Sequence, residues 1–230
     1  LKLMMVDDLP SVAQAAGNTT IDKAQELAQP IAVDGAVGNL SRNYYRIKVA
    51  AGQKLSVEVV ARRLGSALDP LIRLLDAKGR ELTYSDDEPG LRGDARLSYT
   101  FAEAGDYVVE VRDIRYQGGA GHFYRLRVGD FPCLSSPYPM GVTRGSVAKV
   151  TFVGSDAADV GEVDVRAPSE PGTNWVNVAA RRPNGASSGF AMLRIEDVPV
   201  SVEAEPNNEL AKATRVELGH SLNGRIETAG

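Results

Sequence analysis

The chain has 230 residues, of which 43% are hydrophobic and 24% are charged, and its formal net charge is −4. This composition is typical of a globular protein, and the acidic balance argues against a nucleic-acid binder, which usually carries a basic face. The single cysteine, Cys133, excludes an intrachain disulfide. No apolar run approaches the ~20 residues that cross a bilayer, so no membrane span is expected.

Strand patterns dominate the first part of the chain. The only helix-like stretch there is "IDKAQELAQ" (21–29), which predicts at most one short helix. Beyond it, segments rich in β-branched and aromatic residues are separated by Gly-rich turns. They cover 44–49, 54–61, 71–76, 95–101, 106–113 and 122–129. Short strands at this spacing favour an all-β sandwich over an α/β fold, and we expect the sandwich to cover 18–130.

A proline-rich break follows this sandwich. Residues 131–141 contain Pro132, Pro137 and Pro139, and because proline cannot donate to a central ladder, we predict a linker. A second set of strand patterns runs through 146–154, 162–168, 175–183 and 190–199. Its size predicts a smaller Ig-like β-sandwich over 142–200.

The end of the chain repeats its beginning. Asn207 corresponds to Asn18, an offset of 207 minus 18, or 189 residues, which holds without gaps from about Leu3 to Val37. Identical pairs at this offset are Asp8/Asp197, Pro10/Pro199, Ala15/Ala204, Lys23/Lys212, Ala24/Ala213 and Gly35/Gly224. Because Pro and Gly, which constrain the backbone, agree in position, the pattern indicates a tandem array rather than shared composition.

The repeat also predicts how the chain is divided. Residues 1–17 are expected to be the last strand and linker of a preceding repeat, and 201–230 the start of a second, truncated sandwich. One strand without partners cannot bury a core, so we expect 201–230 to be poorly packed or to borrow a neighbour's sheet. Neither end is expected to be a natural terminus, and flanking domains of a parent chain are expected partners.

Several short motifs of the first sandwich resemble one bacterial family. They are Ala51-Gly52-Gln53, Leu68-Asp69-Pro70, Asp86-Asp87, Gly105-Asp106-Tyr107 and Tyr124. With "EAEPNNELAKA" near the end of the chain, they resemble the pre-peptidase C-terminal (PPC) domain, the family that includes the collagen-binding domains of clostridial collagenases. The resemblance implies a jelly-roll-like β-sandwich in a secreted or cell-surface protein, non-catalytic and often beside a peptidase. Residues 138–199, through "YPMGVTRGSVAKVTFVGSD", resemble an IPT/TIG-type Ig-like domain.

Two groups of acidic residues are candidate calcium sites, and some PPC members bind calcium. Asp86, Asp87 and Asp94 share one loop with Glu88, and Asp69 or Asp113 are candidate additional ligands. Calcium takes about six to eight oxygens, largely from carboxylates and carbonyls. The alternative for this loop is a solvated acidic surface.

The second group is Glu203, Glu205 and Asn207. These alternate residues share one side of an extended segment and form a candidate half-site of the next repeat. Their counterparts in the first copy are Gln14, Ala16 and Asn18. The first domain is therefore expected to lack the carboxylates of that site.

Three further motifs have a catalytic or adhesive interpretation and a simpler one. Residues 185–189 fit the G-x-S-x-G nucleophile motif, with Asp197 and His220 following in hydrolase order, but that motif requires an α/β sheet. A loop of small residues between two strands explains it. Arg92-Gly93-Asp94 spells an adhesion tripeptide that recurs by chance, and Trp175 is expected in an Ig-like core, with sugar stacking as the alternative.

These observations favour a non-catalytic module over an enzyme. The expected function is a spacer, adhesion or substrate-anchoring unit of a large secreted or cell-surface bacterial protein, with calcium as a stabilising ion. An extracellular protein or polysaccharide is the expected ligand. The alternative is the accessory C-terminal domain of a secreted peptidase whose catalytic domain lies outside this chain.

Overall fold

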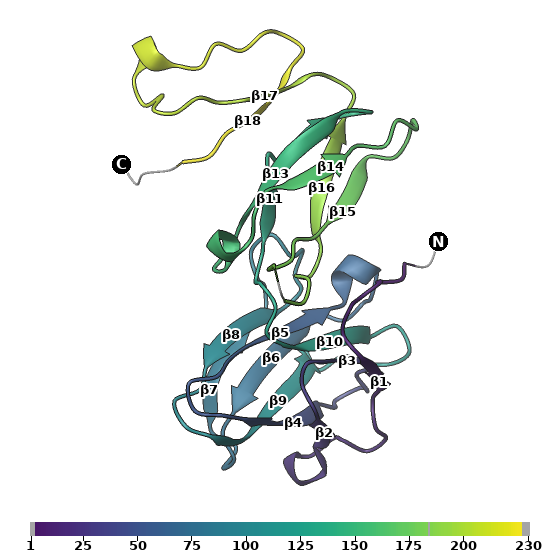
Figure 1. The fold of residues 1–230 in the computed structure, drawn as a ribbon. Helices are drawn as coiled ribbons and strands as arrows, with labels where there is room; N and C mark the ends of the chain where they lie inside the picture. Colours follow the sequence, from purple (N-terminus) through teal and green to yellow (C-terminus); the bar gives the residue numbers. More distant parts are fainter. Residues whose placement is uncertain (1–2, 184, 227–230) are drawn as a thin grey trace. The chain divides into compact units, whose positions relative to one another are not determined.

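The protein is described by a computed structural model that covers residues 3–183 and 185–226 (Figure 1). The ends of the predicted segments 1–17 and 201–230, namely residues 1–2 and 227–230, lie outside this description, as does Asn184. The chain forms two compact units: Leu1–Cys133 with Arg181–Gly189, and Leu134–Ala180 with Phe190–Gly230. Both units are built from strands, which confirms the all-β fold class.

The first unit is a sandwich of two five-stranded sheets. One, called here the β5 sheet, has the order β1-β3-β10-β5-β8, and the other, the β9 sheet, has the order β2-β4-β9-β6-β7. The strands are β1 (Ser11–Ala13), β2 (Gln25–Leu27), β3 (Ile31–Ala36), β4 (Asn43–Val49), β5 (Lys54–Val60), β6 (Pro70–Leu75), β7 (Glu81–Ser85), β8 (Arg96–Thr100), β9 (Gly105–Asp113) and β10 (Phe123–Gly129).

Alternation along the strands builds the core between these sheets. In β5, Leu55, Val57 and Val59 face inward and join residues of the β9 sheet such as Ile47 and Val109 in one buried cluster. Burying such side chains contributes about 1.5–3 kcal/mol each. The intervening residues of β5 point to the opposite face of its sheet. That face carries the site described below.

The short helix predicted within 21–29 is confined to its first three residues. A 3-10 turn, η1 (Ile21–Lys23), takes its first three residues, and β2 follows at Gln25–Leu27. β2 pairs in parallel with β4, from Gln25 beside Tyr45 to Leu27 beside Ile47. Pairing with a neighbouring strand and burial of Leu27 outweigh the local helix preference of this segment.

The second unit contains two three-stranded sheets, with the orders β11-β13-β14 and β12-β16-β15, and a separate pair β17-β18. Its core includes Leu134, Val150 and Leu193. The strands are β11 (Ser136–Tyr138), β12 (Gly141–Thr143), β13 (Val147–Val153), β14 (Val163–Arg166), β15 (Trp175–Val178), β16 (Ala191–Glu196), β17 (Val200–Val202) and β18 (Ser221–Asn223). Short 3-10 turns complete the units: η2 (Arg62–Leu64), η3 (Ala157–Asp159) and η4 (Leu210–Lys212).

The proline-rich segment 131–141 is more structured than a simple linker. Phe131 and Cys133 are buried in the first unit, and Leu134 is buried in the second. Residues 136–138 form β11, which contains Pro137 and lies at the edge of its sheet. An edge position suits proline because the missing N–H does not interrupt a ladder on both sides. Within the described residues, no helix is long and apolar enough to cross a membrane.

The two segments that repeat in sequence also share their internal geometry. β1 pairs in parallel with β3, with Ser11 beside Ala32, and β17 pairs in parallel with β18, with Val200 beside Ser221. Each of these residues is 189 positions from its counterpart. The turns η1 and η4 keep the same offset, as does the backbone bond Gln14 N→Asp34 O, repeated as Glu203 N→Asn223 O at 2.9 Å in both copies.

One side chain occupies the same position in both copies. The Gln14 Oε1 atom accepts a bond from the Ala36 N–H at 2.8 Å, and Glu203 Oε1 accepts one from the N–H of Arg225. In each copy this side chain also packs against a glycine. The Gln14 Oε1 atom lies 2.5 Å from the position that a Cβ on Gly35 would take, and Glu203 Oε2 lies 2.8 Å from that of Gly224. The agreement extends from strand register to a side-chain contact. By contrast, residues 3–10, the counterparts of β16 and its flank, form no strand.

Candidate functional site

A row of charged residues lies on the face of the β5 sheet that points away from the sandwich core. Glu58 of β5 pairs in register with Arg127 of β10 on one side and with Arg96 of β8 on the other. All three side chains are buried, and Arg127 and Glu58 are 0% exposed. An antiparallel ladder places directly opposite residues close together, so this register sets one carboxylate between two guanidinium groups.

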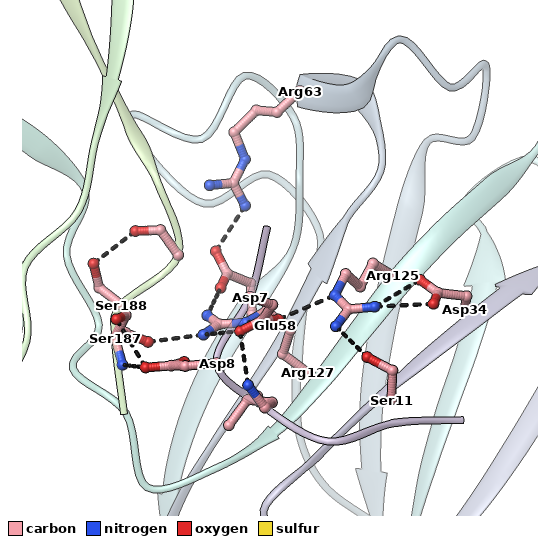
Figure 2. Close-up of polar contacts among 12 residues, drawn as sticks. Asp7, Asp8, Ser11, Asp34, Glu58, Arg63, Arg125, Arg127, Ser187 and Ser188 are labelled. Carbon is pink, nitrogen blue, oxygen red and sulfur yellow. Dashed lines mark hydrogen bonds and ion pairs between the residues drawn. The ribbon is translucent and has the colours of Figure 1, made fainter. Parts of the chain in front are cut away.

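Glu58 is the centre of a buried ion network (Figure 2). Its Oε2 atom lies 2.9 Å from Arg127 Nη1, and its Oε1 atom lies 2.7 Å from Arg63 Nη2. Burial alone would raise the pKa of this carboxyl. The positive charges of Arg63, Arg127 and Arg96 outweigh burial and lower the pKa of Glu58 to about 2. Glu58 is therefore ionised at neutral pH, with a bound counter-charge on each oxygen.

The network continues into the segment that precedes β1. The Asp7 Oδ2 atom accepts bonds from Arg127 Nε at 2.9 Å and from Arg125 Nε at 3.0 Å. Arg125 also donates to both oxygens of Asp34 at 2.9 Å and to the Ser11 hydroxyl at 2.7 Å. Asp7 thus fastens the N-terminal segment to β10 through two arginines, with the geometry drawn in Figure 2.

The loop Arg181–Gly189 belongs to the first unit and adds a third part to this network. The Ser187 carbonyl oxygen accepts a bond from Arg127 Nη2 at 2.7 Å. The Ser187 N–H and hydroxyl both donate to Asp8 Oδ2 at 2.9 Å, and Arg181 Nη2 donates to the same oxygen at 2.7 Å. Burial alone would raise the pKa of Asp8, but these bonds and the charge of Arg181 outweigh it and lower that pKa.

Gly189 of this loop packs against the Glu58 carboxylate. A Cβ on Gly189 would lie 2.2 Å from Glu58 Oε1 and 2.3 Å from Oε2, far inside van der Waals contact. Only a glycine leaves room for this contact while the carboxylate keeps both arginine partners. Gly189 of "GASSG" is therefore explained by its packing against a buried ion network.

Ser187, Asp197 and His220, which follow the chain order of a hydrolase triad, contact different partners in the structure. The Ser187 hydroxyl contacts Asp8 and Arg181, while Asp197 pairs with Arg144 at 2.5 Å. His220 contacts the hydroxyl of Ser201 through Nδ1 at 2.8 Å, a contact that the motif search on the sequence missed. Because Ser201 and His220 lie on β17 and beside β18, this contact follows from the parallel pairing of two segments far apart in the sequence.

The Ser201–His220 contact does not complete a catalytic triad. The carboxylate nearest the other ring nitrogen is Glu217 Oε2, 3.6 Å from Nε2, and its side chain is 83% exposed. A triad requires a hydrogen-bonded acid that orients the imidazole, together with donors for the oxyanion. The pair is therefore a contact between two strands, equivalent to the positions of Val12 and Ile31 in the first copy.

The predicted calcium loop does not bring its carboxylates together. Asp94 is 0% exposed, and its Oδ1 accepts bonds from the N–H groups of Ala61 and Arg62, while its Oδ2 pairs with Arg63 Nε at 2.7 Å. Burial of Asp94 also removes the carboxylate of the RGD tripeptide from the surface, although Arg92 stays exposed. Glu88 pairs with Arg96 at 3.1 Å. Over 3–183 and 185–226, no three His, Cys, Asp or Glu side chains gather as metal ligands.

Other acidic residues of the predicted calcium site bond to backbone N–H groups or to arginine. Asp86 Oδ1 accepts the Asp87 N–H at 2.8 Å, and Asp69 pairs with Arg62 at 3.1 Å. Asp113 accepts the N–H groups of Asp69, Arg115 and Gln117 at 2.8–3.1 Å. These oxygens cap turns and pair with arginine, so they have partners within the protein, and calcium binding by the loop stays a prediction. Sequence proximity placed the acids in one loop, but it did not show which hydrogen bonds they make.

The half-site at Glu203, Glu205 and Asn207 stays a prediction. Asn207 donates through Nδ2 to Glu203 Oε2 at 2.8 Å and through its N–H to Glu205 Oε2 at 2.9 Å. Calcium bound there should raise the melting temperature of the second unit by linkage, and Glu205→Gln should abolish that rise while Glu209→Gln keeps it. Identical melting curves in calcium and in chelator would contradict the prediction.

Trp175 does not occupy the core of the second unit. It is 40% exposed, and the Arg194 guanidinium carbon lies 5.1 Å from its ring centroid, within the range of a cation–π contact. Val178 of the same strand is buried, so alternation along β15 places Trp175 on the opposite face. A groove of about 340 Å³ runs beside it; its lining includes Met140, Met192 and Glu196.

Comparison with known proteins gives likenesses of fold. No family model and no curated protein matches the sequence. Among solved structures, the chain is similar to the pre-peptidase C-terminal domain of collagenase from Bacillus anthracis, with 15% identity and a TM-score of 0.37 over 46% of this chain and 93% of that one.

Two other solved structures are similar to the chain. One is PliG, a periplasmic inhibitor of g-type lysozyme from Aeromonas hydrophila, with 16% identity and a TM-score of 0.34 over 52% of this chain and 94% of that one. The other is CorA, a surface-associated copper-binding protein of Methylomicrobium album BG8, with 12% identity and a TM-score of 0.32 over 52% and 97%. The IPT/TIG-type resemblance of residues 138–199 stays a prediction.

Proposed function

We propose that the chain is a non-catalytic β-sandwich module of a larger secreted or cell-surface protein, in which a large and a small β unit alternate every 189 residues. The module acts as a spacer that anchors its parent protein to an extracellular polymer. The observation that carries this proposal is the agreement of register, turns and side-chain contacts between 10–37 and 199–226. The PPC resemblance supports the extracellular setting.

The chemistry of the described side chains supports a structural role. The one buried charge cluster identified above has every carboxylate matched to arginine or to backbone N–H groups, so it offers no unpaired nucleophile or base. Its charges hold three segments distant in sequence: the N-terminal segment, the β5 sheet and the loop Arg181–Gly189. A unit joined in this way resists separation of its parts, as a spacer requires.

The proposal is tested by cosedimentation of the purified chain with fibrillar collagen, cellulose, chitin and peptidoglycan, each also assayed for soluble products. We expect binding to at least one polymer, with no product released above the level of buffer alone. Ser187→Ala and His220→Ala are the matched variants, because they remove the two serine or histidine groups with a catalytic interpretation. Hydrolysis by the chain that either substitution abolishes would contradict the proposal, as would failure to bind any of the four polymers.

A further inference from the structure

The segment 199–226 displays apolar side chains at positions that are buried in the first copy. Ile226 is 92% exposed, whereas its counterpart Val37 is 1% exposed. Leu222 is 46% exposed, whereas its counterpart Val33 is fully buried. Val216 and Leu27 differ in the same direction, at 39% and 6%. The segment thus carries one side of a sandwich core that the described residues leave uncovered.

The edge of β18 shows the same difference. In the first copy, β3 pairs with β1 on one side and with β10, antiparallel, on the other, with Tyr124 beside Gly35 and Leu126 beside Val33. β18 pairs with β17 on one side, and its sheet contains no other strand among the described residues. A row of backbone groups beside uncovered apolar side chains is a template for another strand.

Gly224 indicates which side chain a strand paired with β18 would place opposite it. In the first copy, a Cβ on Gly35 would lie 3.0 Å from the Tyr124 ring, so the absence of a side chain makes room for an aromatic group from the neighbouring strand. The Tyr124 hydroxyl then bonds to Asn43 at 2.8 Å and to Tyr45 in the β9 sheet. Gly224 likewise has no side chain, and Glu203 lies beside it as Gln14 lies beside Gly35.

We propose that β18 receives an antiparallel strand with the pattern of β10, from a polypeptide equivalent to residues 38–132 that lacks its own β1–β3 segment. This inference rests on the repeat in the proposed function and names the partner of its open end. The complete first unit of another copy does not fit, because its β3 already fills this position beside β10. The occupant is therefore a sandwich that residues 199–226 complete.

The test replaces residues 227–230 of the chain by a second copy of residues 38–132, so that residue 38 follows Ile226 at the offset of 189. We expect a second cooperative unfolding transition, and hydrogen exchange at the amides of Ser221–Asn223 slowed by at least ~100-fold relative to the unextended chain. The first unit, present in both proteins, serves as an internal control for folding. An appended segment that stays unfolded while the first unit is native would overturn the proposal.

Two matched substitutions distinguish register-specific completion from general hydrophobic collapse. Ile226→Asp changes a residue whose counterpart Val37 is buried, and it should remove the second transition. Leu218→Asp changes a residue that is 104% exposed and whose counterpart is the polar Gln29, and it should leave the transition in place. Equal effects of the two substitutions would contradict the proposal, as would pairing of β18 with β18 of a second copy, seen as a dimer of the unextended chain.

This experiment measures folding alone. Absence of polymer binding or the presence of hydrolysis would contradict the proposed function without changing the outcome for the extended chain. Conversely, failure of the appended copy to fold would leave the binding result intact. The two proposals therefore fail separately.

Discussion

Replacing Glu58 by Gln is expected to lower the free energy of unfolding of the first unit by about 3–5 kcal/mol. The amide keeps the size of the side chain but leaves Arg63 and Arg127 buried without their shared counter-charge. Breaking a buried ion pair by removing one partner costs on this order, because the remaining charge has lost its solvation by water. Urea denaturation, followed by circular dichroism and not by tryptophan fluorescence, measures this change in the free energy of unfolding.

A matched variant separates burial from charge. Glu81 pairs with Arg73 at 2.5 Å, but its side chain is 39% exposed, so Glu81→Gln should cost less than about 1 kcal/mol. Equal effects of the two substitutions would show that the burial of Glu58 does not matter. A loss below 1 kcal/mol for Glu58→Gln would contradict the network as described.

The pH dependence of the free energy of unfolding provides a second test of the Glu58 carboxylate. The pKa of Glu58 is lowered from 4.5 to about 2 on folding. Its stabilising contribution is therefore fully present above pH 4.5 and is lost as the pH falls through about 2, because the unfolded chain takes up a proton first. The difference in stability between the unmodified chain and Glu58→Gln should narrow over this interval and stay constant between pH 5 and pH 8.

Replacing Gly189 by Ala is expected to displace the loop Arg181–Gly189 from the β5 sheet. The new methyl group would lie 2.2 Å from one oxygen of a carboxylate that two arginines hold in place, so the loop is the part that moves. Overpacking of this kind costs about 1–3 kcal/mol. Ser187 should lose the bond that its carbonyl accepts from Arg127 and the bond that its N–H donates to Asp8.

Limited proteolysis measures this displacement directly. Trypsin should cut the Arg181–Arg182 bond of the Gly189→Ala variant at least ~10-fold faster, because local opening exposes the bond. Gly161→Ala is the control, since a Cβ there meets no atom within 4 Å and any general effect of the exchange is the same. Unchanged cleavage in Gly189→Ala would show that the loop is not held by its contact with Glu58.

Much of the strand order of the first unit follows from local pattern. The predicted segments 44–49, 54–61 and 106–113 coincide with β4, β5 and β9 to within one residue at each end. These strands alternate strongly between apolar and polar residues, which is the signal that a half-buried strand leaves in a sequence. β1, β2, β3 and β7 were missed: β1 and β2 have three residues each, β3 carries Asp34 and Gly35 in its second half, and β7 has no buried residue.

The candidate site was much less predictable. Alternation in "KLSVEVV" and "FYRLRVG" places Glu58, Arg125 and Arg127 on the outer face of a sheet, where charged residues are usually solvated. Nothing in these segments shows that Asp7 and Ser187 cover that face, because the covering residues lie 120 and 60 positions from Arg127. The partners of Asp94 were missed for the same reason, since they are 31–33 positions away.

The amino-acid sequence was sufficient for the all-β class, for most of the strands and for the offset of 189 residues. Each of these depends on the order and spacing of residue types along the chain, and Pro and Gly mark the same backbone positions in both copies. The closed ion network around Glu58 and the uncovered side of β18 required the folded structure. Both depend on which distant segments come together over a sheet face, and local periodicity carries no record of that.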